Sequence, residues 1–268
     1  MTAAAAARAG RRAKSGARRS TRFGPTLFGV ATLLVLALLW QGAVDAGWVS
    51  PFVAPAPSAI IAAFPALFTQ EGLVSAFFRT FFETFSAAAL AMIIGVPIGW
   101  WLHHKSWAGQ AYESWVASMA AAPLVLLYPL FLVIFGRNSS TIIAMSFLTG
   151  LTPVVLKTKE GLDGTRRVLI NVGRSFGLSQ GKLFWKIMLP AAVPTIGNGV
   201  RLGLIFALIN VVGVEFLINF GGMGELIDDL AQRWEIPRMY GAIFFVILTS
   251  VCFYYLTERL ERWLRPGS

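Results

Sequence analysis

The sequence predicts an all-α, polytopic membrane protein with six transmembrane helices, and three observations support this fold class. Of its 268 residues, 56% are hydrophobic and only 13% are charged, roughly half the charged share of an average soluble domain. The hydrophobic residues gather in long blocks, and the positive charges lie mainly between alternate blocks. A water-soluble enzyme is therefore excluded.

Six blocks approach the length of about 20 residues that a helix needs to cross a bilayer. They cover residues 25–42, 81–101, 115–135, 140–156, 196–219 and 239–255. Trp40, Trp101 and Tyr255 lie near block ends, as interfacial aromatic residues do. The first block continues without a small-residue cleavage pattern, so we expect a retained helix rather than a cleaved signal peptide.

The basic residues predict the orientation. With the N-terminus inside the cell, the inward-facing segments hold 18 Lys and Arg residues and the outward-facing segments hold 4, while Arg201 lies within a block and completes the total of 23. Because Lys and Arg are enriched in cytoplasmic connections, both termini are predicted to be cytoplasmic.

Seven of these basic residues lie among the first 22, in a stretch rich in Ala, Gly and Ser without apolar periodicity. We interpret residues 1–24 as a disordered basic arm held at the membrane by anionic lipid headgroups, and residues 25–268 as the transmembrane domain. The net charge of +10 is explained by this placement, so nucleic acid is not expected as a partner.

The connection between the fourth and fifth blocks, about residues 157–195, is unusually long, and long connections are usually functional. Apolar residues such as Val172 and Phe176 recur there at roughly helical spacing, with basic residues between them. Gly177 interrupts this pattern, and Ser179 can cap a second segment. We expect two short amphipathic helices that meet at a Gly-containing bend.

Pro190 and Pro194 are predicted to stop the second helix and to form a hinge between the loop and the fifth span. Two roles are open for such a hairpin. It can lie on the inner leaflet as an interfacial element, or dock into a groove on another protein.

Short motifs follow one another from about residue 50 to 265. They include Ala54-Pro55-Ala56-Pro57-Ser58, Gly95-Val96-Pro97-Ile98-Gly99, Arg174-Ser175-Phe176-Gly177-Leu178-Ser179, Ile187-Met188-Leu189-Pro190 and Gly221-Gly222-Met223-Gly224. In this order and spacing they resemble the binding-protein-dependent ABC importer permeases, whose cytoplasmic loop carries the "EAA" signature. The resemblance is to the branch associated with nitrate, sulfonate and taurine uptake.

The resemblance implies a type I ABC importer-like permease in the bacterial cytoplasmic (inner) membrane. Its expected function is to move a small solute, such as nitrate, a sulfonate, taurine or a related organic acid. The implied partners are a second permease copy in a homodimer, two cytoplasmic ABC ATPase subunits and an extracytoplasmic solute-binding protein.

The resemblance also places a coupling helix at about residues 171–182. The residues that it assigns to ATPase coupling are Asn171, Arg174, Ser175, Phe176, Gly177, Leu178, Ser179 and Lys182. Phe176 and Leu178 are expected as apolar anchors, although Phe176 could instead pack back on its own hairpin. The Glu-Ala-Ala positions of the signature read Asn171-Val172-Gly173 here, so a salt bridge from that glutamate is not carried over.

The translocation pathway is expected between the second to fifth spans of the two copies. Its candidate residues are Gly95, Pro97, Gly99, Pro123, Pro129, Arg201 and Glu215. For the Gly and Pro residues, helix packing is the alternative role. Arg201 could attract an anion or contact the loop or lipid phosphates, and Glu215 could form an external gate or hold the turn at residues 221–224. Glu83 is expected to be solvated at the outer edge.

The sequence holds no Gly-x-x-x-x-Gly-Lys-Ser/Thr phosphate loop and no catalytic triad or His/Cys metal cluster. We therefore expect a transport subunit rather than an enzyme, without a cofactor of its own, and with ATP and Mg bound by the partner ATPase. The alternatives are an ion-coupled secondary carrier, which usually shows inverted repeats and intramembrane carboxylates, and a non-transporting membrane scaffold.

Overall fold

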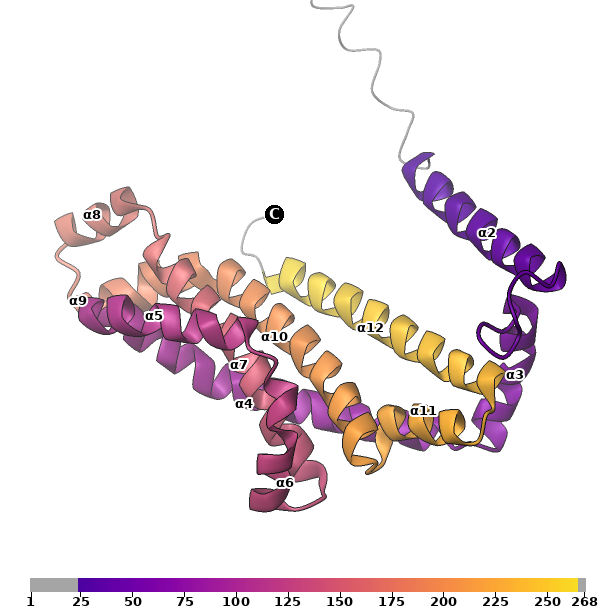
Figure 1. Cartoon of the computed structure of the whole chain (residues 1–268). Helices are drawn as coiled ribbons and strands as arrows, with labels where there is room; N and C mark the ends of the chain where they lie inside the picture. The colour runs from indigo at the N-terminus through magenta and orange to yellow at the C-terminus, as the bar shows by residue number, and fades with distance from the viewer. Residues whose placement is uncertain (1–23, 265–268) are drawn as a thin grey trace, which may run out of the picture. The chain divides into compact units, whose positions relative to one another are not determined.

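The protein is described by a computed structural model that covers residues 24–264, and this part of the chain is helical without β-strands (Figure 1). The elements are α2 (Gly24–Asp45), α3 (Pro57–Thr69), α4 (Leu73–His104), α5 (Ser106–Ala121), η1 (Leu124–Leu127), α6 (Tyr128–Phe135), α7 (Ser139–Asp163), α8 (Arg167–Ser175), α9 (Gln180–Leu183), η2 (Phe184–Met188), α10 (Leu189–Ile218), α11 (Gly222–Gln232) and α12 (Ile236–Leu264). The chain divides into two compact units, residues 1–62 and 63–268. The predicted basic arm lies outside the described residues, except for Gly24 at the start of α2.

The first unit contains α2 and the beginning of α3. The leucine side chains of α2, such as Leu33 and Leu38, are exposed, as expected for a helix surrounded by lipid or by another apolar surface. Gln41 connects the end of α2 to α3, because its Oε1 accepts a hydrogen bond of 3.1 Å from the N–H of Ser58. The chain that follows the Ala-Pro repeat is helical, with Ser58 in the first turn of α3.

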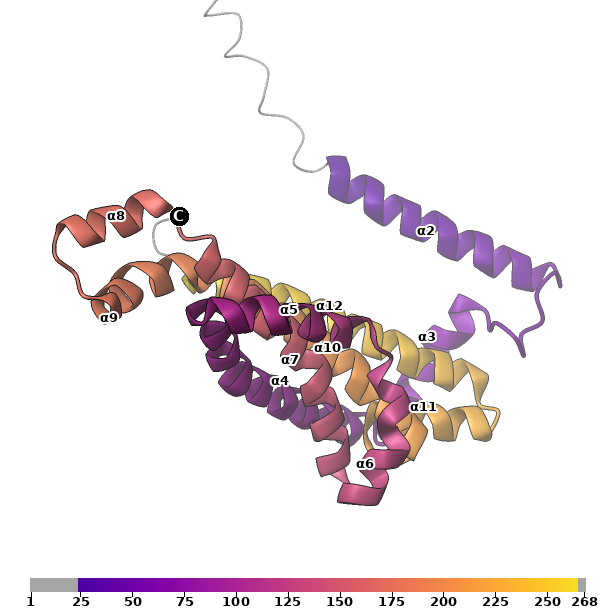
Figure 2. The ribbon, with the colours of Figure 1, turned by 60° about the vertical axis from the view of Figure 1, so that its left-hand side comes forward.

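In the second unit α7 packs between α4 and α10 (Figure 2). Glycines allow the close approach: a β-carbon added to Gly203 would lie 2.8 Å from the carbonyl oxygen of Gly150, and one added to Gly99 would lie 2.6 Å from that of Val155. A β-carbon on Gly95 would lie 2.9 Å from Val154. Gly95 and Gly99 therefore pack α4 against α7, and their assignment to the pathway stays a prediction.

Within the described residues, five helices are long and apolar enough to cross a membrane, and a bent pair gives a sixth if it counts as one span. The bend is the main departure from the predicted spans. Residues 115–135 are not one helix, because α5 and the η1–α6 segment meet at 86°. Pro123 cannot donate a backbone hydrogen bond and disfavours helical geometry at the preceding residue, and Ala122 is indeed extended.

The helix before the fifth span does not end at Pro190 and Pro194, so that prediction is wrong. The chain is helical from Gln180 to Ile218. The wider turn of η2 precedes Pro190, and the N–H of Leu189 donates to the carbonyl of Phe184, five residues back. This shift of the hydrogen-bond ladder lets the helix pass the prolines, while their role as a hinge stays a prediction.

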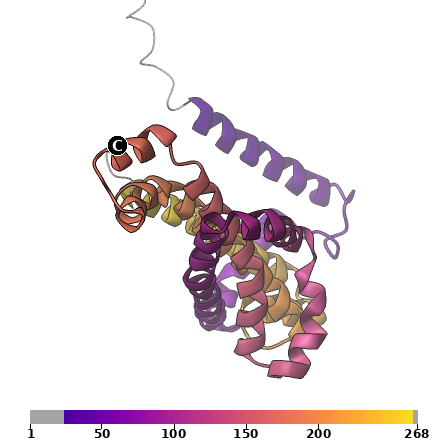
Figure 3. The ribbon, with the colours of Figure 1, turned by 90° about the vertical axis from the view of Figure 1, so that its left-hand side faces the viewer.

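The loop hairpin and the helix α11 lie at opposite ends of α10. At one end lies the hairpin, α8 to η2, in which the arch formed by α8 projects from the packed helices (Figure 2 and Figure 3) while η2 packs on α10, whereas α11 packs on α4 and α12 at the other end. With 30 residues, α10 spans about 45 Å between them. A continuous helix therefore connects the hairpin to the region of α11.

Candidate functional site

The helix α8 ends in a turn that reverses the chain at Gly177. The N–H of Gly177 donates to the carbonyl of Arg174 at 2.9 Å, and the N–H of Leu178 donates to that of Gly173 at 3.1 Å. This pair of bonds closes many helix C-termini and places a residue with positive φ between them. Gly177 has a φ of +69°, so the predicted Gly-containing bend is confirmed. Ser179 precedes α9, but its side chain makes no capping hydrogen bond.

Gly173 closes the inner side of the hairpin. A β-carbon at this position would lie 2.6 Å from the Cδ1 atoms of both Leu183 and Ile187. Leu178, which was expected as an apolar anchor, also packs here and is half-buried. Part of its side chain therefore contacts its own hairpin instead of being free for a partner. Gly173 occupies the last position of the family's Glu-Ala-Ala signature. Packing therefore explains why this position is small even though the glutamate has been replaced.

The outer side of α8 carries an exposed apolar face, which we call the α8 face. It consists of Val168, Val172 and Phe176, four residues apart, and Phe176 is 82% exposed. The alternative in which Phe176 packs back on the hairpin is therefore excluded. The exposed polar residues among those assigned to coupling are Asn171, Arg174, Ser175, Ser179 and Lys182. The sequence assignment missed Val168, although it lies four residues before Val172 and eight before Phe176, on the same helical face.

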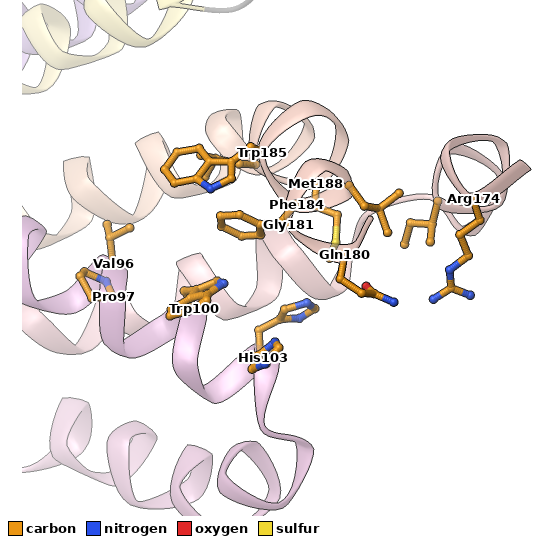
Figure 4. Close-up of a pocket in the computed structure, with 14 residues that line it drawn as sticks. Val96, Pro97, Trp100, His103, Arg174, Gln180, Gly181, Phe184, Trp185 and Met188 are labelled. Carbon is orange, nitrogen blue, oxygen red and sulfur yellow. The ribbon is translucent and has the colours of Figure 1, made fainter. Parts of the chain in front are cut away.

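A cavity of about 710 Å³ lies between the hairpin and the end of α4 (Figure 4). Arg174 and Gln180 lie at one end of it, and Pro97 lies at the other. The rings of Trp100 and Phe184 are 5.8 Å apart, so aromatic contacts bridge the two elements. Because the hairpin continues into α10, a displacement of the hairpin reaches α10 through continuous helix. Pro97, predicted for the pathway, lines this cavity.

The bend between α5 and η1 forms a second cavity, of about 400 Å³, with α7 and α10. Pro123 lines it together with Thr149 and Asn210. The hydroxyl of Ser146 donates to Oδ1 of Asn210 at 3.2 Å, which connects α7 to α10 in the middle of the spans. Sequence reasoning missed these uncharged polar residues because it searched the spans for charges. They add polar groups to the predicted pathway region.

At the far end of α10, Glu215 holds the start of α11. Its side chain is fully buried and accepts hydrogen bonds from Thr80 Oγ1 at 2.7 and 2.9 Å and from the N–H of Gly224 at 2.9 Å. The hydroxyl of Thr80 in turn accepts from the N–H of Met223 at 2.8 Å. These bonds join α4, α10 and α11. The geometry is that of the turn-holding role, and a role as external gate stays a prediction.

Glu83 is fully buried, so the expectation that it is solvated is wrong. Its Oε1 accepts a bond of 3.4 Å from Arg79 Nε, its carboxyl lies beside that of Glu215, and its Oε2 is buried without a hydrogen-bond partner. The reason is the length of α4, which begins at Leu73 rather than near residue 81. Position 83 therefore lies about 15 Å into the helix.

Arg201 lies near the middle of α10, in the half closer to the hairpin, and is partly buried. Its Nη2 donates to Asn198 Oδ1 at 2.5 Å, and its guanidinium lies 5.2 Å from the centre of the Tyr254 ring. Pro129 is exposed in the first turn of α6. Pro97 and Arg201 thus lie in the half of the bundle closer to the hairpin, and Glu215 lies at the other end. The structure does not gather the predicted pathway residues into one site.

Comparison with known proteins gives one consistent result. The family model described as "binding-protein-dependent transport system inner membrane component" matches residues 91–266. Similar proteins are the riboflavin transport system permease protein RibX of Chloroflexus aurantiacus (27% identical, covering 90% of each chain) and the bicarbonate transport system permease protein CmpB of Synechocystis sp. (25% identical, 91% of this chain and 89% of that one). The formylaminopyrimidine transport permease protein ThiX of Halalkalibacterium halodurans is 23% identical over 90% of this chain and 94% of its own.

Solved structures agree on the fold. A chain of the MetNI methionine ABC transporter in an inward-facing conformation superposes with a TM-score of 0.64 at 18% identity, covering 72% of this chain and 95% of that chain. A chain of an amino acid ABC transporter gives a TM-score of 0.60 at 18% identity, covering 75% and 96%. The fold is therefore that of type I ABC importer permeases.

Proposed function

Because the chain belongs to the family of binding-protein-dependent transport system inner membrane components, we propose that it is the membrane-spanning subunit of an ATP-driven importer for a small solute. A separate ATPase supplies the energy, and a solute-binding protein delivers the solute outside the cell. The chain binds no nucleotide itself, and two copies of it enclose the pathway.

The α8 face is the observation that carries this proposal. Three apolar side chains, Val168, Val172 and Phe176, point away from the chain's own packed helices on a hairpin with a fixed bend. An exposed aromatic on a short helix is suited to docking into a groove on a partner. Arg174 beside it offers a charged contact at the rim of such a groove.

The hairpin also has a route by which movement reaches the membrane. It runs through η2 into α10 as continuous helix, and α10 packs along α7. A shift of the docked hairpin therefore tilts α10 and widens or narrows the cavity beside Pro123 and Asn210. Thr149 and Asn210 line this cavity, so they are our candidates for polar contacts with the solute.

The orientation follows from charge. The hairpin belongs to the predicted inward-facing segments, which hold 18 of the 23 basic residues. The hairpin is therefore cytoplasmic, where an ATPase can reach it, both termini are cytoplasmic, and α11 faces the outside.

The solute is a small molecule or ion, and we propose an inorganic or organic anion. The bicarbonate permease among the similar proteins supports an anion, whereas the names of the riboflavin and formylaminopyrimidine permeases show that this family handles varied solutes.

A co-purification experiment tests the proposal. The tagged protein is purified in mild detergent, and the ATPase that accompanies the wild type is compared with that retained by Phe176→Asp. We expect a loss of at least about tenfold, because a charge replaces an apolar anchor. Phe176→Tyr keeps the ring and retains the ATPase, and Trp185→Asp, which changes another exposed aromatic of the hairpin outside residues 171–182, controls for added charge.

If wild-type dimers carry no ATPase, the importer proposal fails. The ion-coupled carrier then becomes the better hypothesis, and the buried carboxyls of Glu83 and Glu215 are the observation in its favour.

A further inference from the structure

The turn between α11 and α12 places a tryptophan where glycine is favoured. The N–H of Trp234 donates to the carbonyl of Ala231 at 3.1 Å, and the N–H of Glu235 donates to that of Leu230 at 3.0 Å. This is the same pair of bonds that closes α8 around Gly177. Trp234 therefore takes a φ of +59°, which is unfavourable for a bulky side chain.

The chain gains no packing in return. Trp234 is 75% exposed, and within the described residues its indole makes no ring contact. A strained backbone position that carries a large exposed apolar side chain is a reason to look for a function.

A network of ion pairs fixes this turn. Arg233 pairs with Glu71 at 2.5 Å and with Asp229 at 2.8 Å, and Arg238 pairs with Glu71 and with Glu235, both at 2.6 Å. Glu71 precedes α4, so the network ties the end of α11 to two other elements. The backbone that carries Trp234 is thus held in one place, so a partner that covers the indole does not have to order this turn.

The surroundings of Trp234 favour a water-soluble partner over lipid tails. Arg233 and Glu235 of this network directly flank Trp234 in the sequence, and burying these charges in hydrocarbon is costly. Glu71 and Asp229 also line a mainly polar hollow of about 520 Å³, together with Arg79 and Glu225. The helix α11, which contributes Glu225 and Asp229 to this hollow, lies at the end of the unit away from the hairpin (Figure 1).

We infer that Trp234 is the aromatic anchor on which the solute-binding protein docks over this hollow. The inference rests on the proposed function, which places α11 on the outer side. Trp is among the residues that most often dominate the binding energy of protein interfaces. The mixed charges of the network form the polar rim around it.

The test uses the complex of permease and ATPase in nanodiscs and the purified solute-binding protein of the same transport system. We expect Trp234→Gly to weaken binding at least tenfold while the melting temperature of the complex stays the same or rises, because glycine relieves the strain. Trp234→Phe keeps most of the affinity. Asn219→Gly is the matched control, since Asn219 is the other non-glycine residue with positive φ within the described range, and it keeps wild-type affinity.

Gln232→Cys, in a Cys252→Ala background, provides the second measurement, because position 232 is exposed beside Trp234 and this variant keeps the tryptophan. We expect a membrane-impermeant maleimide to label it in the nanodisc and the binding protein to block the labelling. Unchanged binding by Trp234→Gly overturns the inference, as does a cysteine that is shielded before the binding protein is added, which indicates contact with lipid. A complex without ATPase contradicts the proposed function instead, and this is seen before either measurement begins.

Discussion

Thr80 on α4 and Glu215 on α10 are 135 positions apart in the sequence, yet their side chains join the two helices. The hydroxyl of Thr80 donates to the carboxylate of Glu215 at 2.7 and 2.9 Å. The same hydroxyl accepts from the N–H of Met223. One side chain of α4 therefore connects the end of α10 to the start of α11.

Replacing Thr80 by valine keeps the shape and removes both roles of the hydroxyl. We expect Thr80→Val to lower the free energy of unfolding by about 2 kcal/mol or more, because a buried carboxylate and a buried N–H each lose a partner. Thermal unfolding in detergent measures the effect. Thr84→Val, one turn further along α4, is the control, since its buried hydroxyl has no hydrogen-bond partner and its loss leaves stability equal or higher. Equal destabilisation by both variants contradicts the role given to Thr80.

Gly173 is expected to be essential to the hairpin. Gly173→Val forces its side chain against Leu183 and Ile187, so the hairpin opens and the retained ATPase falls. Gly181→Ala is the control, because a β-carbon there meets nothing within 4 Å. Limited proteolysis of the loop, together with the co-purified ATPase, reports the change. If Gly173→Val behaves like wild type in both assays, the hairpin is not held at this position.

The crossing of α7 and α10 is expected to tolerate no side chain. Gly203→Ala places its β-carbon about 2.8 Å from the carbonyl oxygen of Gly150, and backbone cannot turn aside as a flexible side chain can. The expected loss is about 1–3 kcal/mol. Gly213→Ala on the same helix meets nothing, so it is expected to stabilise by about 0.5–1 kcal/mol. The thermal midpoints of the two variants should therefore move in opposite directions.

The ion pairs around Glu71 predict an acid-dependent stability. Hydrogen bonds from Arg233 and Arg238 hold the pKa of Glu71 below its ordinary value, although its partial burial acts in the other direction. A carboxyl with a lowered pKa stabilises the fold fully above the pKa of the unfolded chain, about 4.3, and this contribution is lost as the pH falls through the folded value. Melting temperatures between pH 3 and 7 should show a steeper acid decline for wild type than for Glu71→Gln. Parallel profiles contradict this assignment.

The sequence predicted most of the spans and the bend at Gly177, because long apolar blocks and an isolated glycine are strong local signals. The predictions from sequence were wrong where contacts between distant segments or the local backbone hydrogen bonding decide the structure. Pro190 did not end a helix. The wider turn in η2 shifts the backbone hydrogen-bond ladder just before this proline, which has no N–H to donate. Glu83 is buried, contrary to the prediction. A charge near the edge of an apolar block gives no sign that another helix covers it, so the sequence could not reveal this burial.

The candidate site was predictable in part for the same reason. Phe176 and Gly177 follow from helical spacing and from a known motif. The tie between Thr80 and Glu215, the Ser146–Asn210 pair and the exposed Trp234 depend on contacts between distant segments or on backbone geometry that one sequence does not display.

The most direct test of the account is photo-crosslinking from the α8 face. The photoreactive amino acid p-benzoylphenylalanine replaces Phe176 in one sample and Trp185, which lines the cavity behind the hairpin, in another. After irradiation of membranes, the account predicts an adduct with an ABC ATPase, identified by mass spectrometry, from position 176 and a far weaker one from position 185. Adducts from position 176 to lipid alone, in membranes that contain the ATPase, would contradict the claim that this hairpin couples the permease to its energy source.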